Sequence, residues 1–469
     1  MEDITDHALH KFFYPESVAL IGASANPIRP SFNLVGNQVK LGYQGRMYPV
    51  HPTEKEICGV KAYPSVTSIE EIVDLAVIAV AHAQTPMILQ ECIEKGIRRV
   101  VLVAGGFSEI GEEGRKIQHQ MLELVRKSGS RAIGPNALSP INPGHNFAIS
   151  FHPLEQLKTG GLSLIFQSGL YEPRLRWMFS TFNLHLSKLI DLGNKMDLNE
   201  VDALSYLVFD PMTRVIGLHM ESLEGEGRKF LDLIHQASAL GKRVVVLKSG
   251  RTEEGAKAAA SHTGVMVKGN DMVFDRLLKQ CGAIRAYTIE EFFDLTRALE
   301  RFGPLTLKGD RIAVATLPGG EGVVMTDLVQ QEGMKMAKTN EKTIKKLKPI
   351  FPPWEISANP FDLGVALQFN DAIRVYETLV SAMSEDENVD ALHIQIPDQI
   401  LFLPKEFFKL FHHAPALGKP LALWVAGMES GTHETLQWLE DQGIPVFPTP
   451  EKAIRALSAL HQLSLYGKA

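Results

Sequence analysis

The sequence predicts an α/β protein of three domains in series, a Rossmann-like first domain followed by two flavodoxin-like domains. A chain of 469 residues is too long for a single hydrophobic core. Short apolar runs alternate with longer amphipathic stretches, which is the pattern of parallel strands joined by helices. The alternation restarts after polar, Gly/Pro-containing breaks at residues 156–161 and 302–309. These breaks predict domains at residues 1–150, 151–303 and 304–469.

Each predicted strand is a short apolar run bounded by turn residues. In the first domain the runs are Val18–Ile21, Arg46–Val50, Leu75–Val80, Arg99–Val103 and Ala132–Ile133, with helical patterns between them at Met87–Lys95 and Gly114–Lys127. The second domain has runs at Leu162–Phe166, Lys188–Asp191, Val215–Met220, Arg243–Lys248 and Ala283–Arg285. The third has runs at Arg311–Thr316, Ala391–Gln395, Leu421–Val425 and Val446–Phe447.

Composition and charge exclude several functional classes. The net charge of -6, with both signs interspersed, indicates an ordinary solvated surface and no nucleic-acid partner. The three cysteines are far apart, so neither a disulfide framework nor a zinc site is expected. The N-terminus lacks the pattern of a secretory signal, and no apolar stretch approaches the roughly 20 residues of a membrane span. We therefore expect a cytoplasmic protein with no membrane partner.

The first apolar run leads into a turn of small residues, Gly22, Ala23 and Ser24, and then into a helix. Such turns bind phosphates in open α/β sheets, although a tight structural connection gives the same pattern. NAD fits poorly, because the next two glycines of its motif are missing and the segment Tyr48–Pro52 carries no acidic residue for the ribose. Coenzyme A, which bears a 3′-phosphate, is compatible with the turn but is not singled out by it.

Two later strand ends are expected to line the same crevice. Gly105, Gly106 and Phe107 follow the fourth predicted strand, and Asn136 follows the fifth within a Gly-Pro-Asn turn. Ligands bind at the carboxyl ends of parallel strands, so both loops are candidates for ligand contacts. Ordinary turn chemistry would also place glycine, proline and asparagine at these positions.

The second domain contains a segment suited to phosphoryl transfer. We expect His262 in a loop after the strand that ends at Lys248, among the small residues Ser261, Thr263 and Gly264, of which the first two are hydroxylated. A neutral imidazole is nucleophilic near pH 7, and a carboxylate can orient its other nitrogen. Glu221, which follows a neighbouring strand, is a candidate for that carboxylate, although a surface acid is the simpler reading.

A phosphoryl group also needs a cradle, and the turn Gln167, Ser168 and Gly169 precedes a helical pattern whose amides can supply one. Lys195 closes the next strand and either adds a cation or is an ordinary solvated lysine. No P-loop is present, because an alanine follows Gly255 where the motif requires lysine. If the protein uses ATP, we expect the nucleotide to bind elsewhere.

Over nearly its whole length the chain resembles the α subunits of NDP-forming acetate/acyl-CoA ligases, relatives of succinyl-CoA synthetase. The most specific shared segments are Lys248–Arg251 and Ala259–Gly264. The other shared segments are Ser17–Ser24, Tyr48–Val50, Gly134–Asn136, Gln167–Gly169, Leu192–Lys195, Gly319–Val323, Asn359–Leu363 and Gly443–Pro450.

The resemblance implies a reaction and a set of roles. His262 would be the phosphohistidine, Glu221 the carboxylate that steadies it, and the helix after Ser168 and Gly169 a support for the phosphoryl group. Gln167, Ser261, Thr263 and Gly264 would complete that phosphate site. Coenzyme A would bind the first domain, through Gly22, Ala23, Ser24, Pro49, His51, Gly105, Gly106, Phe107 and Asn136.

The family reaction is acid + CoA + NTP ⇌ acyl-CoA + NDP + phosphate, through an acyl phosphate. The resemblance implies that ATP/ADP or GTP/GDP, with Mg²⁺, binds an ATP-grasp module. We expect that module on another chain, so a separate β subunit and a hetero-oligomer are implied, with a small carboxylic acid as substrate.

Three segments depart from the family pattern. Ala137 and Ser139 stand where the family usually has cysteine and glycine, and Leu170–Glu172 replaces a run of small residues. The segment Thr316–Glu321 lacks the usual Asn-Ser before its glycines and the usual proline after them. These departures leave the acyl group open, whereas the preserved segment around His262 favours retained phosphoryl transfer.

Two rival functions remain at this stage. A CoA-binding or regulatory homologue would keep the fold without ligase activity, and would show no phosphorylation at His262. A Rossmann oxidoreductase is disfavoured by the missing glycines and the missing acid, and would bind NAD but not CoA.

Overall fold

The computed structural model describes residues 4–155, 157–167, 169–263, 270–317, 319–354, 358–426 and 434–466, with only the backbone described at 170 and 260–263. The chain forms two compact units. The first consists of Met1–Ser180 with Leu184–Thr288, and the second of Thr181–Asn183 with Ile289–Ala469. No helix of the described residues is long and apolar enough to cross a membrane.

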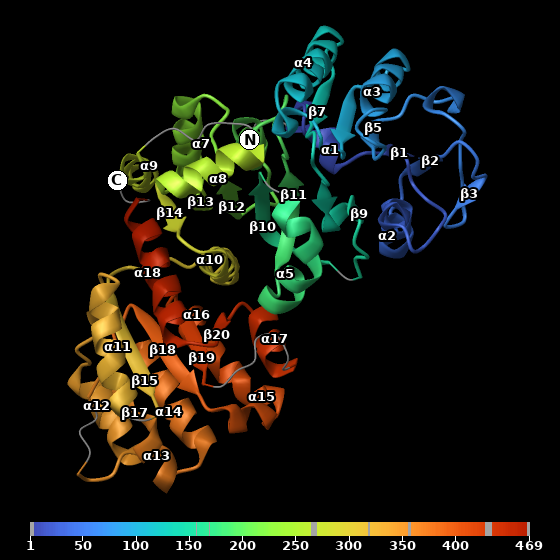
Figure 1. Ribbon diagram of the computed structural model, residues 1–469. Coiled ribbons are helices and arrows are strands. Elements are labelled where there is room, and N and C mark those ends of the chain that lie inside the picture. The colour runs from blue at the N-terminus through green and yellow to red at the C-terminus, as the bar shows by residue number, and fades with distance from the viewer. Residues whose placement is uncertain are drawn as a thin grey trace. The chain divides into compact units, whose positions relative to one another are not determined.

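The first unit begins with a five-stranded parallel sheet in the order β2-β1-β5-β6-β7 (Figure 1). Its strands are β1 Ser17–Ile21, β2 Arg46–Val50, β5 Leu75–Ile78, β6 Arg99–Leu102 and β7 Arg131–Ile133. The covering helices are α2 Asn33–Leu41, α3 Thr85–Glu94 and α4 Glu112–Lys127, with α1 His10–Phe13 before the sheet and a short hairpin, β3 Glu56–Ile57 and β4 Val60–Lys61, beside it.

A seven-stranded sheet completes the first unit, in the order β14-β13-β12-β10-β11-β8-β9. Its parallel strands are β10 Lys158–Phe166, β11 His185–Asp191, β12 Val215–Met220, β13 Arg243–Lys248 and β14 Ala283–Ala286. Two short antiparallel strands, β8 Ile141–Asn142 and β9 Phe147–Ala148, extend it at the β11 end. The helices of this part are α5 Leu175–Phe182, α6 Glu200–Leu207, α7 Gly227–Ala239, α8 Glu253–Thr263 and α9 Asp271–Gln280.

The second unit is built on a six-stranded sheet that contains the path β16-β15-β18-β19-β20, with β17 paired to β15. The strands are β15 Arg311–Thr316, β16 Lys335–Met336, β17 Phe361–Asp362, β18 Ala391–Ile396, β19 Leu421–Val425 and β20 Val446–Phe447. The main helices are α10 Ile289–Arg301, α11 Gly319–Gln331, α12 Glu341–Leu347, α13 Leu363–Phe369, α14 Ala372–Glu385, α17 Glu434–Asp441 and α18 Pro450–Tyr466.

All three sheets share one strand order. When the parallel strands of each sheet are numbered along the chain, with the short β17 set aside, they run 2-1-3-4-5. The order reverses between β1 and β5, between β10 and β12, and between β15 and β18. In open α/β sheets ligands bind at such reversals, outside the carboxyl ends of the strands. The fold class predicted from the sequence is confirmed.

The domain boundaries at 150 and 303 remain predictions. Strands β8 and β9 precede residue 150 yet hydrogen bond within the second sheet. Helix α10 precedes residue 303 yet belongs to the second compact unit.

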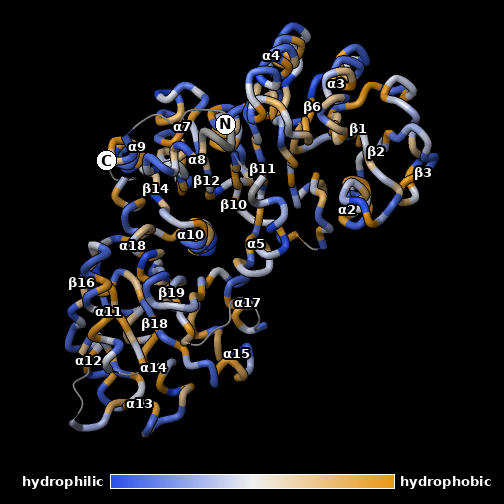
Figure 2. The backbone as a smooth tube through the Cα atoms, viewed as in Figure 1, coloured by the Kyte–Doolittle hydropathy of each residue, from blue (hydrophilic) through white to orange (hydrophobic). Residues whose placement is uncertain are grey.

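Alternation along the first strand explains how two helical layers cover its sheet. Val18 and Leu20 pack into one hydrophobic cluster with α2, whereas Ala19 and Ile21 pack into another with α3 and α4. Successive strand residues point to opposite faces, and burial of each large apolar side chain contributes roughly 1.5–3 kcal/mol. Figure 2 shows the result, with hydrophobic and hydrophilic residues both present around outer helices such as α4. The α2 cluster continues into the second sheet, so the two sheets of the first unit share a core.

Candidate active site

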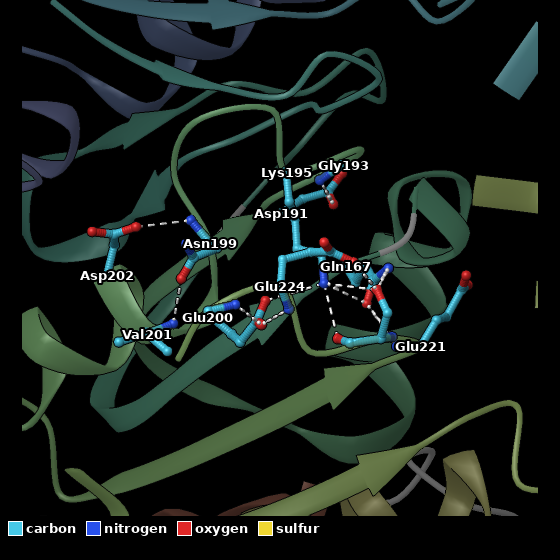
Figure 3. A network of polar contacts seen from close by, with 12 residues as sticks. Gln167, Asp191, Gly193, Lys195, Asn199, Glu200, Val201, Asp202, Glu221 and Glu224 are labelled. Carbon is cyan, nitrogen blue, oxygen red and sulfur yellow. Dashed lines mark hydrogen bonds and ion pairs between the residues drawn. The ribbon is translucent and has the colours of Figure 1, made fainter. Parts of the chain in front are cut away.

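Gln167, directly after β10, joins the ends of two neighbouring strands where the second sheet reverses (Figure 3). Its Oε1 accepts hydrogen bonds from the backbone N–H of Glu221 at 2.7 Å and of Ser222 at 2.9 Å. Its Nε2 donates to Oγ of Ser222 at 3.1 Å. The Gln167 side chain is therefore held as a link between the segments that follow β10 and β12.

Lys195 brings a buried cation to the same cluster. Its Nζ donates to Oε1 of Gln167 at 3.1 Å and to the carbonyl oxygen of Ser222 at 2.9 Å. It also lies 3.1 Å from Oε2 of Glu200, and both side chains of this ion pair are 1% exposed. The possibility of an ordinary solvated lysine is wrong, because the loop after β11 turns the side chain inward at a backbone φ of 53°.

Glu221 has a fixed backbone and a largely buried side chain, 9% exposed for the whole residue. In Figure 3 its carboxylate points away from the cluster formed by Gln167 and Lys195. The backbone bond to Gln167 thus directs the carboxylate outward from the sheet edge. Burial excludes the simpler reading of Glu221 as a surface acid.

The segment predicted as a histidine loop continues a helix. α8 extends from Glu253 to Thr263, and its backbone includes His262. The run of alanines at residues 258–260 favours helix, and Thr252 Oγ1 accepts the N–H of Gly255 at the helix start. The side chains of Ser261, His262 and Thr263, and all of Ser168 and Gly264, lie outside the described residues.

α8 lies against the short 3₁₀ helix η4, Ser108–Ile110, in the loop that follows β6 of the first sheet. That loop also carries the predicted CoA-binding residues Gly105, Gly106 and Phe107. The helix of His262 and the predicted CoA loop are therefore neighbours within one compact unit.

The helix expected after Ser168 and Gly169 begins as a 3₁₀ helix, η6, over Gly169–Arg174. Pro173 lies inside it, and the α-helix α5 starts only at Leu175. Tyr171 of this turn packs inside the protein. Tyr171 is 1% exposed and stacks on Phe166 with ring centroids 4.0 Å apart.

The predicted CoA residues of the first turn lie at the carboxyl edge of the first sheet. Gly22 has a φ of 84°, and a Cβ there would come within 2.3 Å of the carbonyl oxygen of Ala79, so only glycine fits. Ala23 and Ser24 are buried. Pro49 lies within β2, and His51, which follows that strand, is half-buried.

The loop after β6 is fastened by Glu109, which the sequence did not single out. Its carboxylate accepts the N–H of Gly106 at 2.6 Å and of Phe107 at 3.1 Å, and the side-chain amide of Asn194 at 2.7 Å. Burial opposes ionisation of Glu109, but these hydrogen bonds outweigh it and lower its pKa. Phe107 is fully buried, so only its backbone is available to a ligand.

Asn136 and the loop after β11 tie the first sheet to the second. Asn136 has a φ of 60°, and its N–H donates to the carbonyl of Ala104 at 3.0 Å. The N–H of Asn194 donates to the carbonyl of Pro135 at 2.8 Å. The residues predicted for CoA and for phosphate are thus joined through Asn194 and Lys195, adjacent residues of one loop.

Asp191, at the end of β11, is a second buried acid that the sequence did not reveal. Burial raises its pKa to about 7, despite hydrogen bonds from the N–H groups of Gly193 at 3.1 Å and Leu138 at 3.4 Å. Its position beside Leu138 and Ser139 places it at the departure from the family pattern around Ala137. Strand-end position was the available signal for both Asp191 and Glu109.

Among the described residues no group of three or more histidine, cysteine, aspartate or glutamate side chains is arranged to hold a metal ion.

Two domain families match the first compact unit, and the second match extends into α10 of the second unit. Residues 16–142 match the family described as CoA binding domain, and residues 159–299 match the family described as succinyl-CoA ligase like flavodoxin domain. Fold and site together define a ligase that combines these two domains.

Whole-chain relatives narrow this class. The chain is 37% identical to the acetate–CoA ligase [ADP-forming] I subunit alpha of Pyrococcus furiosus, over 97% of this chain and 98% of that one. It is 36% identical to acetate–CoA ligase [ADP-forming] II of Archaeoglobus fulgidus, over 99% of this chain and 68% of that longer protein. A solved structure of the dinucleotide forming acetyl-coenzyme A synthetase 1 of Ca. Korarchaeum cryptofilum, with phosphate and ADP, superposes with a TM-score of 0.87 at 30% identity, covering 100% of this chain and 98% of that one.

The chain belongs to the family of the alpha subunits of ADP-forming acetate–CoA and related acyl-CoA ligases. The resemblance predicted from the sequence is confirmed, and the family is one of acid–thiol ligases.

Proposed function

We propose that this chain carries the CoA, acyl and phosphohistidine steps of an NDP-forming acyl-CoA synthetase. The observation that carries the proposal is the contact of α8, the helix of His262, with η4 in the loop predicted to bind CoA. Thioester chemistry on CoA and phosphoryl transfer to His262 both need reacting groups held close together.

The chemistry divides into three transfers. In the direction of NTP synthesis, a phosphate oxygen attacks the thioester carbon, the C–S bond breaks, and CoA leaves as a thiolate that takes a proton. A ring nitrogen of His262 then attacks the acyl phosphate at phosphorus, forming a P–N bond and releasing the carboxylate. The phosphoryl group finally passes from nitrogen to an oxygen of the NDP.

Glu221 is proposed to orient the His262 ring by accepting its other N–H. Oε1 of Gln167 accepts the Glu221 backbone N–H at 2.7 Å, so Glu221 is held at a fixed position relative to the start of the phosphate turn. Ser168, Gly169, Ser261, Thr263 and Gly264 are proposed to surround the phosphoryl group.

The first sheet is proposed to bind CoA through Gly22, Ala23, Ser24, Pro49, His51, Gly105, Gly106, Phe107 and Asn136. Gly22 supports this, because its positive φ and its close approach to the Ala79 carbonyl admit no side chain, as in turns where the backbone itself approaches a ligand. Glu109 already occupies the N–H groups of Gly106 and Phe107, so this loop would offer shape and carbonyl oxygens to the ligand.

A separate ATP-grasp β subunit is proposed to bind the nucleotide and Mg²⁺. The chain matches an alpha subunit along 98% of that subunit's length, but only 68% of a ligase whose name carries no subunit label. The remaining third of the longer protein corresponds in this proposal to the missing module. The acid is a small carboxylate, and acetate is the first to test.

The test uses two routes to the same phosphohistidine. Radiolabelled phosphate with acetyl-CoA should label the chain without nucleotide, and radiolabelled ATP with Mg²⁺ should label it once the partner chain is added. Both labels should be acid-labile and absent in His262→Ala. The matched control is His235→Ala, which removes an exposed histidine of α7 and should be labelled like the wild type.

Labelling that persists in His262→Ala would contradict the assignment of the phosphohistidine. CoA binding without labelling by either route would favour the alternative, a CoA-binding or regulatory homologue without ligase activity.

Glu221→Gln separates orientation from nucleophilicity. It should slow labelling by roughly two orders of magnitude while leaving the site of labelling unchanged. The control Glu226→Gln, at an exposed position after the same strand, should have no effect. Equal labelling rates in the two variants would remove Glu221 from the mechanism.

A further inference from the structure

His219 lies near the end of β12 between two hydroxyl groups from different segments. Tyr171 Oη is 2.9 Å from His219 Nδ1, and Ser249 Oγ is 2.7 Å from His219 Nε2. The His219 residue is 3% exposed, and the Tyr171 ring meets the imidazole edge-on at 79°. The three side chains form a continuous row of hydrogen bonds, buried at Tyr171 and His219 and half-buried at Ser249.

The imidazole in this row is neutral. Burial lowers the pKa of His219 to about 4, so near pH 7 one ring nitrogen donates and the other accepts. Burial also raises the pKa of Tyr171, which keeps its hydroxyl protonated. The row can therefore order its protons from Tyr171 towards Ser249 or in the opposite sense, but each order needs both hydroxyl groups.

The row connects the two segments that the proposed function brings to the phosphoryl group. Tyr171 belongs to η6, the turn that follows Gln167 and Gly169. Ser249 begins the loop that leads from β13 to α8, the helix of His262. Backbone bonds hold the strands beneath, from the N–H of Gln167 to the carbonyl of His219 and from the N–H of Ser249 to that of Met220.

A second anchor holds η6 on its other side. Glu172 accepts hydrogen bonds from Ser150 Oγ at 2.9 Å and from the N–H of Phe151 at 2.8 Å, and pairs with His152 Nδ1 at 2.8 Å. With Glu172 fixed to this connecting segment and Tyr171 fixed to His219, the turn is held by two of its own adjacent side chains.

We propose that Tyr171, His219 and Ser249 form a positioning row that sets the spacing between the phosphate-binding turn after β10 and the helix that carries His262. This deepens the proposed function and rests on it. None of the three residues touches the reacting atoms in this proposal. They act by fixing where the turn and the helix start, and small displacements of reacting groups reduce rates strongly.

The experiment removes one hydroxyl at a time. Tyr171→Phe and Ser249→Ala should each lower the rate of His262 labelling from acetyl-CoA and radiolabelled phosphate by about fivefold, the effect of one lost hydrogen bond. Because both act through one ring, the double variant should fall well short of the twenty-five-fold loss that about fivefold effects give when independent. The dissociation constant of CoA should stay unchanged in all three, as measured by calorimetry.

Tyr206→Phe is the matched control. Tyr206 is a buried tyrosine of α6 in the same unit, and its hydroxyl lies 3.1 Å from a ring nitrogen of His10, outside the two segments that the row connects. It should lose a comparable hydrogen bond and label at the wild-type rate. A loss of labelling in this control equal to that of Tyr171→Phe would show general destabilisation and overturn the proposal.

Replacing the His219 ring by a side-chain amide should restore part of the labelling rate that His219→Ala loses. His219→Asn places an amide nitrogen near the Nδ1 position and should retain the Tyr171 side, whereas His219→Gln places one near Nε2 and should retain the Ser249 side. Each should label faster than His219→Ala. If His219→Ala does not fold, the two hydroxyl variants still decide the matter.

The outcomes separate the two proposals. If the wild-type chain is not labelled, the proposed function fails and the positioning row fails with it. If the wild type is labelled and Tyr171→Phe and Ser249→Ala match it, only the positioning row is overturned. Multiplicative losses in the double variant would overturn the coupling through His219.

Discussion

Lys195 Nζ lies 3.1 Å from Glu200 Oε2 inside the first unit, and each side chain is only 1% exposed. The second carboxylate oxygen of Glu200 accepts the N–H groups of Glu224 at 2.6 Å and of Gly225 at 3.1 Å. The pair therefore holds the segment after Glu221 in place, and Lys195 also donates a hydrogen bond to Gln167. A buried charge pair here supports the position of the Glu221 carboxylate.

Lys195→Met should destabilise the protein by about 3–5 kcal/mol, because it leaves the Glu200 carboxylate buried without its cation. Chemical denaturation followed by circular dichroism measures the change. Lys127→Met, which removes a lysine 78% exposed in an ion pair with Glu123, should cost less than about 1 kcal/mol. Similar decreases in the free energy of unfolding in both variants would show that the buried ion pair stabilises the protein no more than the exposed one.

Asp191 should make stability fall as pH rises towards neutrality. Its folded pKa of about 7 lies above its ordinary value of 3.8, so between these values the folded state holds a proton that the unfolded state has released. Stability from this group is full below about pH 4 and is lost by about pH 7, at about 1 kcal/mol per pH unit. Asp191→Asn should remove that slope, as measured by the free energy of unfolding at pH 5, 6, 7 and 8. Identical slopes in the two proteins would contradict a raised pKa.

His393 is a fully buried histidine on β18 of the second unit, and neither ring nitrogen makes a hydrogen bond of standard geometry among the described residues, although the backbone of Ala422 favours the charged ring. Burial lowers its pKa to about 4, so its contribution to stability is lost as pH falls from about 6.5 to about 4. His393→Leu should stabilise the protein by about 1–3 kcal/mol and reduce its acid sensitivity. Thermal unfolding at pH 5 and pH 8 tests both effects, and a destabilised variant would indicate a partner for the ring.

Gly22→Ala should unfold the first sheet or abolish CoA binding, because the new Cβ would lie 2.3 Å from the Ala79 carbonyl oxygen. Gly42 is the matched control, since it also has a positive φ, 74°, but has open space around it. Gly42→Ala should cost only the backbone strain of about 1–2 kcal/mol. Circular dichroism and CoA titration compare the two, and equal effects would exclude the steric argument.

The sequence was sufficient for the strands but not for the side-chain contacts. Val215–Met220 and Arg243–Lys248 match their predicted bounds, because continuous apolar runs between turn residues identify buried parallel strands. His262 was predicted in a loop, whereas α8 continues through it, because the alanines before it favour helix. The small hydroxylated residues near His262 favoured the loop prediction over the helix.

The contacts of Lys195, Glu109 and His219 could not be predicted from the sequence. Each is a polar residue near a strand end, where exposure is the common outcome, and each is held by partners that lie far away along the chain. In the sequence, Tyr171 and Glu172 were likewise interpreted only as bulky residues beside a phosphate site. In the structure the Tyr171 side chain hydrogen bonds to His219, and the Glu172 side chain hydrogen bonds to the Ser150–His152 segment. These contacts hold the turn in place.

The common 2-1-3-4-5 order of the three sheets has a consequence for specialisation. Each sheet has a strand reversal of the same type, and therefore the same type of edge at which a ligand can bind. Specialisation then requires changes only in the loops at that edge. The third sheet retains such an edge, where Gln395 accepts the N–H of Leu317 at 2.5 Å across its own reversal, as Gln167 does in the second. A substitution in the loops at one edge can therefore change one binding step while the three sheets keep their strand order.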